Sequence, residues 1–332
     1  MFYLLCLSLC FAVFFIVTAG ASLVLLPLLR IVISRDLRRA RAGAGAGAKT
    51  RANLIFTVRV LPALLGSVAA LGLVLPAFLR FEPSSTREIP GMPLLLLAGL
   101  GALMVGAIVL RCWRILRTTY VMQRDWLKKA QRFSRCGRRI PVYCVEESAP
   151  LLAVTGIFRP RIFISRGVAA VLDSPELHAA LAHEFSHVAA GDNLKQFLLK
   201  ISRPPAWLRF PKQLDSAWVN NSELAADEGA IAGGASALDL SSALVKVGRL
   251  SVRNFAPSGL AASHLVDGCG AATQVRVLRL CELIANDATL GTSEAADRPS
   301  YLPLILATSF VMYFALLSSL HAIHALLEFL VR

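Results

Sequence analysis

The stretch that decides the fold is residues 177–200, which read LHAALAHEFSHVAAGDNLKQFLLK. It places His183 and His187 four residues apart, with Glu184 beside the first of them. On a helix, residues four apart lie on one face, so both imidazoles can bind the same metal ion. Zinc held by two imidazoles and one further ligand keeps its fourth position open for water. The spacing therefore predicts one Zn²⁺ per chain, with Glu184 taking a proton from that water.

A second segment strengthens this prediction, because an amphipathic helix can carry two histidines and a glutamate for no chemical reason. Residues 221–230 read NSELAADEGA. If this segment is helical, Glu223 and Asp227 lie one turn apart. One carboxylate could then ligate the metal, and the other could hydrogen-bond a ligating imidazole. Two helices would together supply a complete site.

The composition predicts a membrane protein. Hydrophobic residues make up 56% of the 332 residues and the mean hydropathy is +0.61, above the range of ordinary soluble domains. Apolar stretches predict three transmembrane helices within residues 1–110, at about 1–29, 60–79 and 92–110, and a fourth within 301–332. The fold class expected is a mostly α membrane protein, with an α+β domain at residues 140–300 inserted between the third and fourth helices.

The formal charge of +14 is concentrated beside the apolar spans. Eight basic residues and one acidic residue lie between Arg30 and Arg59, whereas residues 140–300 carry fourteen basic and sixteen acidic ones. An excess of Lys and Arg beside spans indicates cytoplasmic loops rather than a nucleic-acid surface. We therefore expect both termini outside, the inserted domain in the cytoplasm, and no direct contact with nucleic acid. The seven cysteines form no CxxC pair, which fits a reduced compartment.

Two basic segments are expected to connect the spans to the domain. Residues 30–59 are predicted to be a basic cytoplasmic loop that contains a flexible Ala/Gly linker at 42–48. Residues 111–139 mix aromatic and basic side chains and predict a juxtamembrane helix along the inner bilayer surface. Docking of a partner protein is the alternative for this helix.

Within the inserted domain, residues 140–146 and 151–165 predict short strands with a hairpin break at Arg159 and Pro160. The sheet either offers a free edge to an extended peptide or only packs the central helix, and the sequence leaves both open. Ser174 is expected to cap that helix, which should end before Gly191, and Asp192 is expected to cap the next helix.

Three runs together resemble a known family: GIFRPRIFIS at 156–165, LHAALAHEFSHVAAGDNL at 177–194 and SELAAD at 222–227. They look like the beta-lactam-sensor antirepressor (BlaR/MecR-type) membrane zinc metallopeptidases. The wider gluzincin group, including the HtpX and CAAX prenyl endopeptidases, shares the two-part site. The resemblance implies zinc ligands His183, His187 and Glu223, with Glu184 as general base and Asp227 as partner of a ligating histidine.

The same resemblance implies a multi-pass protein of the bacterial inner (plasma) membrane that cuts a protein substrate on the cytoplasmic side. That substrate would be a transcriptional repressor or a membrane protein. Sensors of the family continue into an extracellular penicillin-binding domain that is not found in this sequence, so beta-lactam sensing is not expected. Arg276 resembles an arginine that follows the third ligand in related peptidases, and His264 is the other candidate to stabilise the oxyanion.

Two alternatives remain open, and a third is disfavoured. The protein could be a quality-control or processing peptidase of the HtpX/CAAX type, or a catalytically silent membrane scaffold. An intramembrane protease is disfavoured because charged residues such as Glu176 and Lys195 flank the histidine motif.

His321, His324 and Glu328 share a face of the last span, where they would form a second polar site or simply lie at the membrane surface. The oligomeric state is not predicted.

Overall fold

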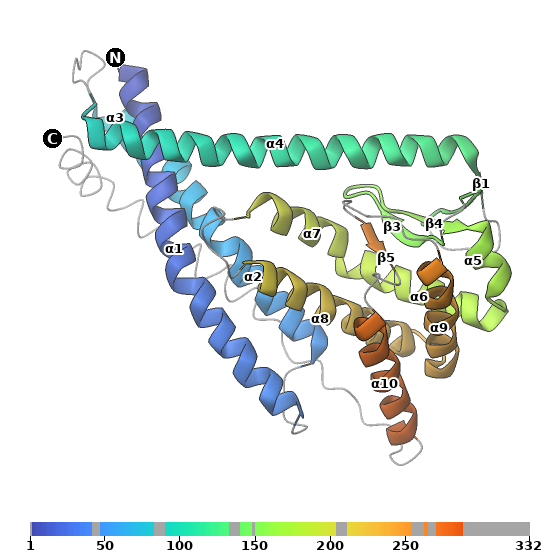
Figure 1. Cartoon of the computed structure of the whole chain (residues 1–332). Coiled ribbons are helices and arrows are strands. Elements are labelled where there is room, and N and C mark those ends of the chain that lie inside the picture. Colours follow the sequence, from blue (N-terminus) through green and yellow to red (C-terminus); the bar gives the residue numbers. More distant parts are fainter. Residues whose placement is uncertain are drawn as a thin grey trace.

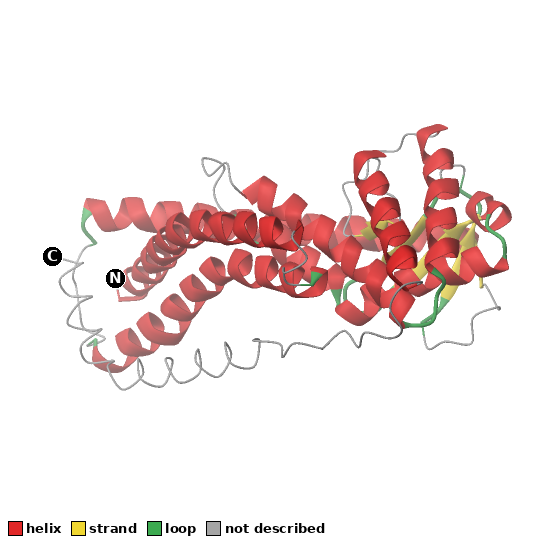
Figure 2. Cartoon of the chain, turned by 90° about the horizontal axis from the view of Figure 1, so that it is seen from below, coloured by secondary structure: helices red, strands yellow, loops and turns green. Residues whose placement is uncertain are grey.

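The structure is a computed structural model of the whole chain (Figure 1). It describes residues 2–41, 47–82, 90–132, 140–147, 150–203, 211–253, 262–264 and 270–287. The predicted fourth span and its residues His321, His324 and Glu328 lie outside these ranges. The molecule is elongated, with long helices at one end and a small sheet among shorter helices at the other (Figure 2).

Three helical rods make up the elongated end. They are α1 (Phe2–Arg41), the continuous run of α2 (Ala48–Ser67), the π-helical η1 (Val68–Val74) and α3 (Leu75–Phe81), and α4 (Met92–Lys129). Each is long and apolar enough to cross a membrane, over Phe2–Leu29, Ala48–Phe81 and within Met92–Lys129. The first three predicted spans thus coincide with helices of suitable length.

The rods pack closely through glycines. A Cβ atom on Gly101 of α4 would lie 2.1 Å from the carbonyl oxygen of Phe11 in α1. A Cβ atom on Gly66 of α2 would lie 2.0 Å from Oγ1 of Thr18. Small residues at such crossings let helix backbones approach closely in membranes. The central helix α1 therefore holds α2 and α4 in one bundle.

The segment at residues 30–59 is largely helical, which corrects the basic loop predicted there. The first helix continues to Arg41, and α2 already begins at Ala48. Ala48, Ala52, Ile55 and Arg59 are buried at helical spacing. The last three approach two helices of the domain, α7 (Asp192–Ile201) and α8 (Pro211–Ala232). This packing stabilises the basic stretch as a helix.

Residues 111–129 continue α4 without a break, which corrects the separate surface helix predicted at 111–139. No glycine or proline occurs between Ala107 and Lys129, so nothing bends the chain at the membrane boundary. The end of the rod lies over the sheet, where the Trp126 ring packs 5.1 Å from that of Phe163 (Figure 1). Gln123 donates a hydrogen bond to Thr155 at 3.0 Å. Trp126 thus packs on the protein's own sheet, whereas Trp113 and Tyr120 of the same stretch are exposed.

The sheet has the strand order β1-β2-β4-β3-β5. The strands are β1 (Ala130–Arg132), β2 (Val142–Val145), β3 (Leu152–Thr155), β4 (Arg161–Ser165) and β5 (Ala262–His264). β2 and β4 are parallel and the other pairs are antiparallel, so the predicted hairpin is β3–β4. β3 is not a free edge, because β5 pairs with its other side.

The described helices of the domain lie mostly on the sheet face opposite α4, except residues 192–201, which contact α4 itself. They are α5 (Arg166–Val171), α6 (Ser174–Ala190), α7 (Asp192–Ile201), α8 (Pro211–Ala232), α9 (Ala237–Arg253) and α10 (Gly270–Asp287). Side chains alternate along the strands, as the pleat requires: Leu152 and Val154 face α6 and α9, whereas Ala153 and Phe163 face α4. The central helix α6 is therefore fixed between the sheet and α8.

The ends of α6 lie within one residue of those predicted from the sequence. Its cap is Asp173 rather than the predicted Ser174, and Asp173 forms a capping box with Glu176. The helix ends at Gly191, whose φ of 69° is the left-handed conformation that glycine adopts without strain.

Glu176 also links α6 to α9, and we expect Glu176→Gln to destabilise the domain. The carboxylate accepts hydrogen bonds from Ser242 and, at 2.6 Å, from Lys246. Burial by itself would raise the pKa of Glu176, but the bonds from Lys246, Ser242 and the Asp173 amide lower it below its ordinary value. A lowered folded pKa stabilises the protein above about pH 4.3, and this stabilisation is lost as the pH falls through the folded pKa.

The variant should therefore lose about 1–3 kcal/mol of stability at pH 7. Thermal unfolding in detergent from pH 7 to pH 3 measures both effects. Unfolding of the variant should depend less on pH than that of the parent. An equal pH dependence in the two proteins would contradict the role assigned to Glu176.

Candidate metal centre

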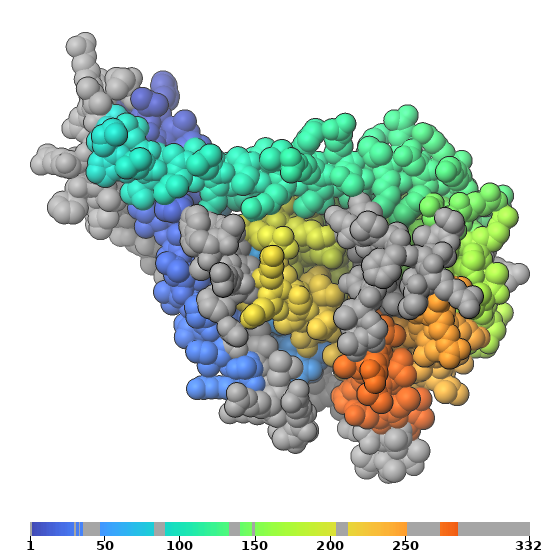
Figure 3. All heavy atoms as spheres, viewed as in Figure 1, coloured from blue at the N-terminus to red at the C-terminus, as the bar shows by residue number. Residues whose placement is uncertain are grey.

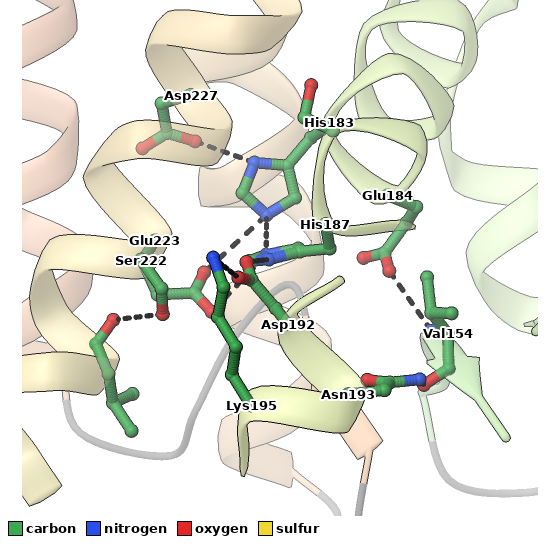
Figure 4. Close-up of polar contacts among 12 residues, drawn as sticks. Val154, His183, Glu184, His187, Asp192, Asn193, Lys195, Ser222, Glu223 and Asp227 are labelled. Carbon is green, nitrogen blue, oxygen red and sulfur yellow. Dashed lines mark hydrogen bonds and ion pairs between the residues drawn. The ribbon is translucent and has the colours of Figure 1, made fainter. Parts of the chain in front are cut away.

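The five residues predicted to form the site come from two helices that cross. His183, Glu184 and His187 lie on α6, and Glu223 and Asp227 lie on α8. Gly229 of α8 allows the close crossing, because a Cβ atom there would lie 3.0 Å from the Ser186 hydroxyl of α6. The helical spacing directs both imidazoles toward Glu223, while Asp227, one turn after Glu223, lies at the other nitrogen of His183 (Figure 4).

Three ligand atoms converge at that point. The Nε2 atoms of His183 and His187 are 3.1 Å apart. Each lies 3.5 Å from a carboxylate oxygen of Glu223. Tetrahedral zinc with bonds of about 2.0–2.1 Å places neighbouring ligand atoms about 3.3 Å apart. The three side chains, all within 4.8 Å of one another, therefore fit a zinc ion.

Each histidine is oriented by a carboxylate on its other nitrogen. Nδ1 of His183 lies 2.8 Å from Asp227, and Nδ1 of His187 lies 2.7 Å from Asp192. A proton on Nδ1, donated to the carboxylate, leaves the Nε2 lone pair for a metal. Asp227 was predicted as such a partner, whereas Asp192 was predicted only to cap a helix. Its side chain makes no cap in the structure, where Gly191 precedes the helix.

Glu184 lies beside the metal position and is fully buried. Its Oε2 atom accepts a hydrogen bond from the Val154 amide of β3 at 3.1 Å (Figure 4). Its Oε1 atom is buried and has no hydrogen-bond partner among the described residues. Burial raises the pKa of Glu184 to about 7. A carboxylate with one uncommitted oxygen and a pKa near neutrality suits a group that takes up and returns a proton.

The charges of the site favour a cation. Burial by itself would raise the pKa of Glu223, but Arg276 and His187 hold it well below its usual range. Burial by itself would lower the pKa of His187, but Glu223 and Asp192 raise it to about 10. The neighbouring carboxylates favour the protonated form of the imidazoles, so a metal ion must displace these protons when it binds. Metal binding at this site should therefore weaken as the pH falls.

Arg276 of α10 binds the two carboxylates of α8. Its Nε and Nη2 atoms lie 2.8 and 2.7 Å from the two oxygens of Asp227, and Nη1 lies 2.9 Å from Glu223. The side chain is 5% exposed. Arg276 thus positions a ligand and the partner of a ligand, a role that the sequence did not reveal. His264 lies in β5, where its backbone pairs with Ala153, but its side chain is outside the described part of the structure.

We expect Arg276→Met to weaken zinc binding about tenfold to a hundredfold, because its loss removes the three contacts that hold Glu223 and Asp227 in position. Titration of the full chain with zinc in the presence of a competing chelator measures the change. Arg279→Met, on the exposed side of the same helix, is the matched control and should bind zinc as the parent does. Equal affinities in all three proteins would exclude the positioning role.

Four further hydrogen bonds fix the surroundings of the site. Asn193 of α7 donates hydrogen bonds to the carbonyl oxygens of Val154 and Gly156, at 3.2 and 3.1 Å. Lys195 of α7 donates to Asn53 of α2 at 3.0 Å. Arg51 of α2 donates to Asn221 of α8, two residues before Glu223, at 2.9 Å. The second membrane helix therefore contacts α8, which carries Glu223, and α7, which follows the helix of the two histidines.

Residues 122–265 match the family model described as Peptidase family M48. The matched part runs from the end of α4 to β5 and contains both histidines, Glu184, Glu223 and Asp227. None of the curated proteins matches the chain. The match supports a membrane-type zinc metallopeptidase family, in agreement with the three membrane-length helices.

Proposed function

We propose that this protein is a membrane-bound zinc endopeptidase of the gluzincin type, acting on a protein substrate. The observation that carries the proposal is the meeting of His183, His187 and Glu223 within 4.8 Å, with the buried carboxylate of Glu184 beside them. The match to Peptidase family M48 supports the reaction class.

Zinc held by His183, His187 and Glu223 would lower the pKa of a bound water and polarise the carbonyl of the peptide bond. Glu184 accepts the proton of the attacking water on its uncommitted oxygen and returns it to the nitrogen of the leaving amine. Asp192 and Asp227 keep the imidazoles in the tautomer that ligates. Arg276 holds Glu223 in place.

Charge supports a cytoplasmic position for the domain in a multi-pass protein of the plasma membrane. Arg59 and Arg111 are the first charged residues beside the apolar parts of α2 and α4, on the side where the domain lies. Such residues favour the cytoplasmic side. None of the described helices that are both long and apolar enough to span a membrane carries a metal ligand, so the proposed hydrolysis takes place beside the bilayer.

The proposal is tested with the purified full chain in detergent. We expect about one zinc per chain and cleavage of an unfolded protein such as reduced casein, with cleavage lost on chelation and restored by zinc. Zinc retention without cleavage of any unfolded protein would instead favour a silent scaffold.

Regulated cleavage of a transcriptional repressor is the biological role we propose, and quality control or processing of membrane proteins is the alternative. Comparison of cells expressing the parent or Glu184→Gln separates the two. Stabilisation of one DNA-binding protein in the variant supports the repressor role, whereas accumulation of many membrane proteins supports quality control.

A further inference from the structure

A cleft of about 540 Å³ leads away from the candidate metal centre. Its walls come from α7, α8 and α10, and among the described residues they include the apolar side chains of Leu199, Trp218, Val219, Leu224 and Val275. Figure 3 shows atoms of α7 and α8, in yellow, exposed below α4 and between the first helices and α10. A mostly apolar cleft of this size is typical of a binding site.

The cleft connects two chemically different ends. Glu223 and Arg276 line one end, so this end adjoins one of the three candidate metal ligands. Lys200, Arg203 and Lys212 line the other end, together with Asp215. Asp215 and Glu223 are eight residues apart on α8, which is about 12 Å at 1.5 Å per residue. An extended peptide covers this distance with about four residues.

The far end carries more positive than negative charge. Its only described carboxylate is Asp215, which is shared between Arg59 at 3.2 Å and Arg203 at 3.4 Å. Arg59 is buried, and its Nη2 atom has no hydrogen-bond partner in the described structure. Arg111 of α4 is held close by, with Nη1 donating to the carbonyl oxygen of Arg203 at 2.9 Å. One carboxylate thus balances the charge of several cations. This end of the cleft therefore keeps an excess of positive charge, which is complementary to an anion.

We infer that the cleft binds the substrate chain on one side of the scissile bond and selects an acidic residue about four positions from that bond. This inference rests on the proposed peptidase function. The occupant is an extended polypeptide, because the cleft ends at a metal ligand, where the peptide bond must lie. Its intervening side chains are apolar and pack against Trp218 and Leu224. Its acidic side chain meets Lys212 and Arg203 at the far end.

The test uses the full chain in nanodiscs of neutral lipid and a library of synthetic peptides with apolar cores. Each of the five positions on either side of the core carries Asp, Asn or Lys, and mass spectrometry locates the cuts. We expect peptides with Asp about four residues from the cut, on one side only, to be cleaved about tenfold faster than those with Lys.

Lys212→Glu should remove or invert this preference, because it reverses the charge of an exposed side chain at the far end. Arg249→Glu is the matched control: it makes the same change of charge on the exposed face of α9, away from the cleft, and should keep the preference for Asp. An Asp preference that survives in Lys212→Glu would overturn the inference.

Three other outcomes are equally decisive. Equal cleavage of Asp and Lys peptides by the zinc-loaded parent overturns the inference but leaves the peptidase function intact. A rate that depends on anionic phospholipid in the nanodiscs, and not on peptide charge, assigns the far end to lipid phosphate and also overturns it. Cleavage of no peptide by zinc-loaded protein overturns the proposed function, and the inference with it.

Discussion

Glu184→Gln is expected to lower the rate of peptide hydrolysis about a thousandfold while zinc stays bound. The amide cannot accept the proton of the attacking water, and general acid–base catalysis contributes about 10²–10⁴-fold to such reactions. The substitution keeps the shape of the side chain. The amide oxygen can still accept the hydrogen bond that the Val154 amide now donates to the carboxylate. Glu184 does not belong to the group of three converging ligands, so the metal should be retained.

Zinc content and casein hydrolysis of the purified variant check this expectation. Glu228→Gln, a partly buried glutamate on α8 outside the ligand group, is the control and should hydrolyse casein at the parent rate. Hydrolysis by Glu184→Gln at more than about a tenth of the parent rate would show that another group takes the proton.

The five candidate site residues could be placed close together from the sequence because they lie four or one apart on two helices. Helical spacing alone then determines which side chains share a face. The pairing of Asp192 with His187 was not predicted, because Asp192 does not follow this helical spacing. It lies five residues after His187, and the chain leaves the helix at Gly191 before reaching it. Its pairing with His187 depends on the left-handed turn at Gly191, which brings the carboxylate back to Nδ1.

The role of Arg276 could not be derived from spacing either. It lies 49 residues beyond Asp227 in the sequence, and its three contacts with Glu223 and Asp227 exist only because α10 packs beside α8. A buried arginine between two carboxylates leaves no periodic signal. The resemblance pointed to the residue, and the contacts of the guanidinium assign it a positioning role. Its role as oxyanion stabiliser stays a prediction.

For the membrane helices, the sequence predicted the apolar parts but not the polar ends. Hydropathy located the apolar parts of α1, α2 and α4, because each exceeds the length needed to cross a bilayer. It could not show that the polar ends stay helical, since Arg51 and Trp126 are stabilised by contacts with Asn221 and Phe163 of the domain. These ends join the membrane bundle to the metal site, and packing rather than propensity determines their structure.

Glu223→Ala is expected to lower zinc affinity more than a hundredfold and to abolish hydrolysis with it. Loss of a residue that only orients a ligand costs about ten- to a hundredfold, so loss of a ligand should cost more. The substitution also removes the anion that faces Arg276 at 2.9 Å and both imidazoles at 3.5 Å. A cation would then have to bind beside a guanidinium whose charge is balanced by Asp227 alone. The substitution therefore weakens zinc binding in two ways: it removes a ligand, and it makes the charge of the site less favourable to a cation.

Competition with a chromogenic zinc chelator measures the affinity, and Glu228→Ala on the same helix is the control. The control should keep the parent affinity, because it shortens a glutamate of α8 outside the ligand group. Thermal unfolding of both zinc-free variants separates loss of the ligand from loss of the fold. If Glu223→Ala bound zinc as tightly as Glu228→Ala, the two histidines would have to find their third ligand elsewhere. The crossing of α6 and α8 would then be only structural.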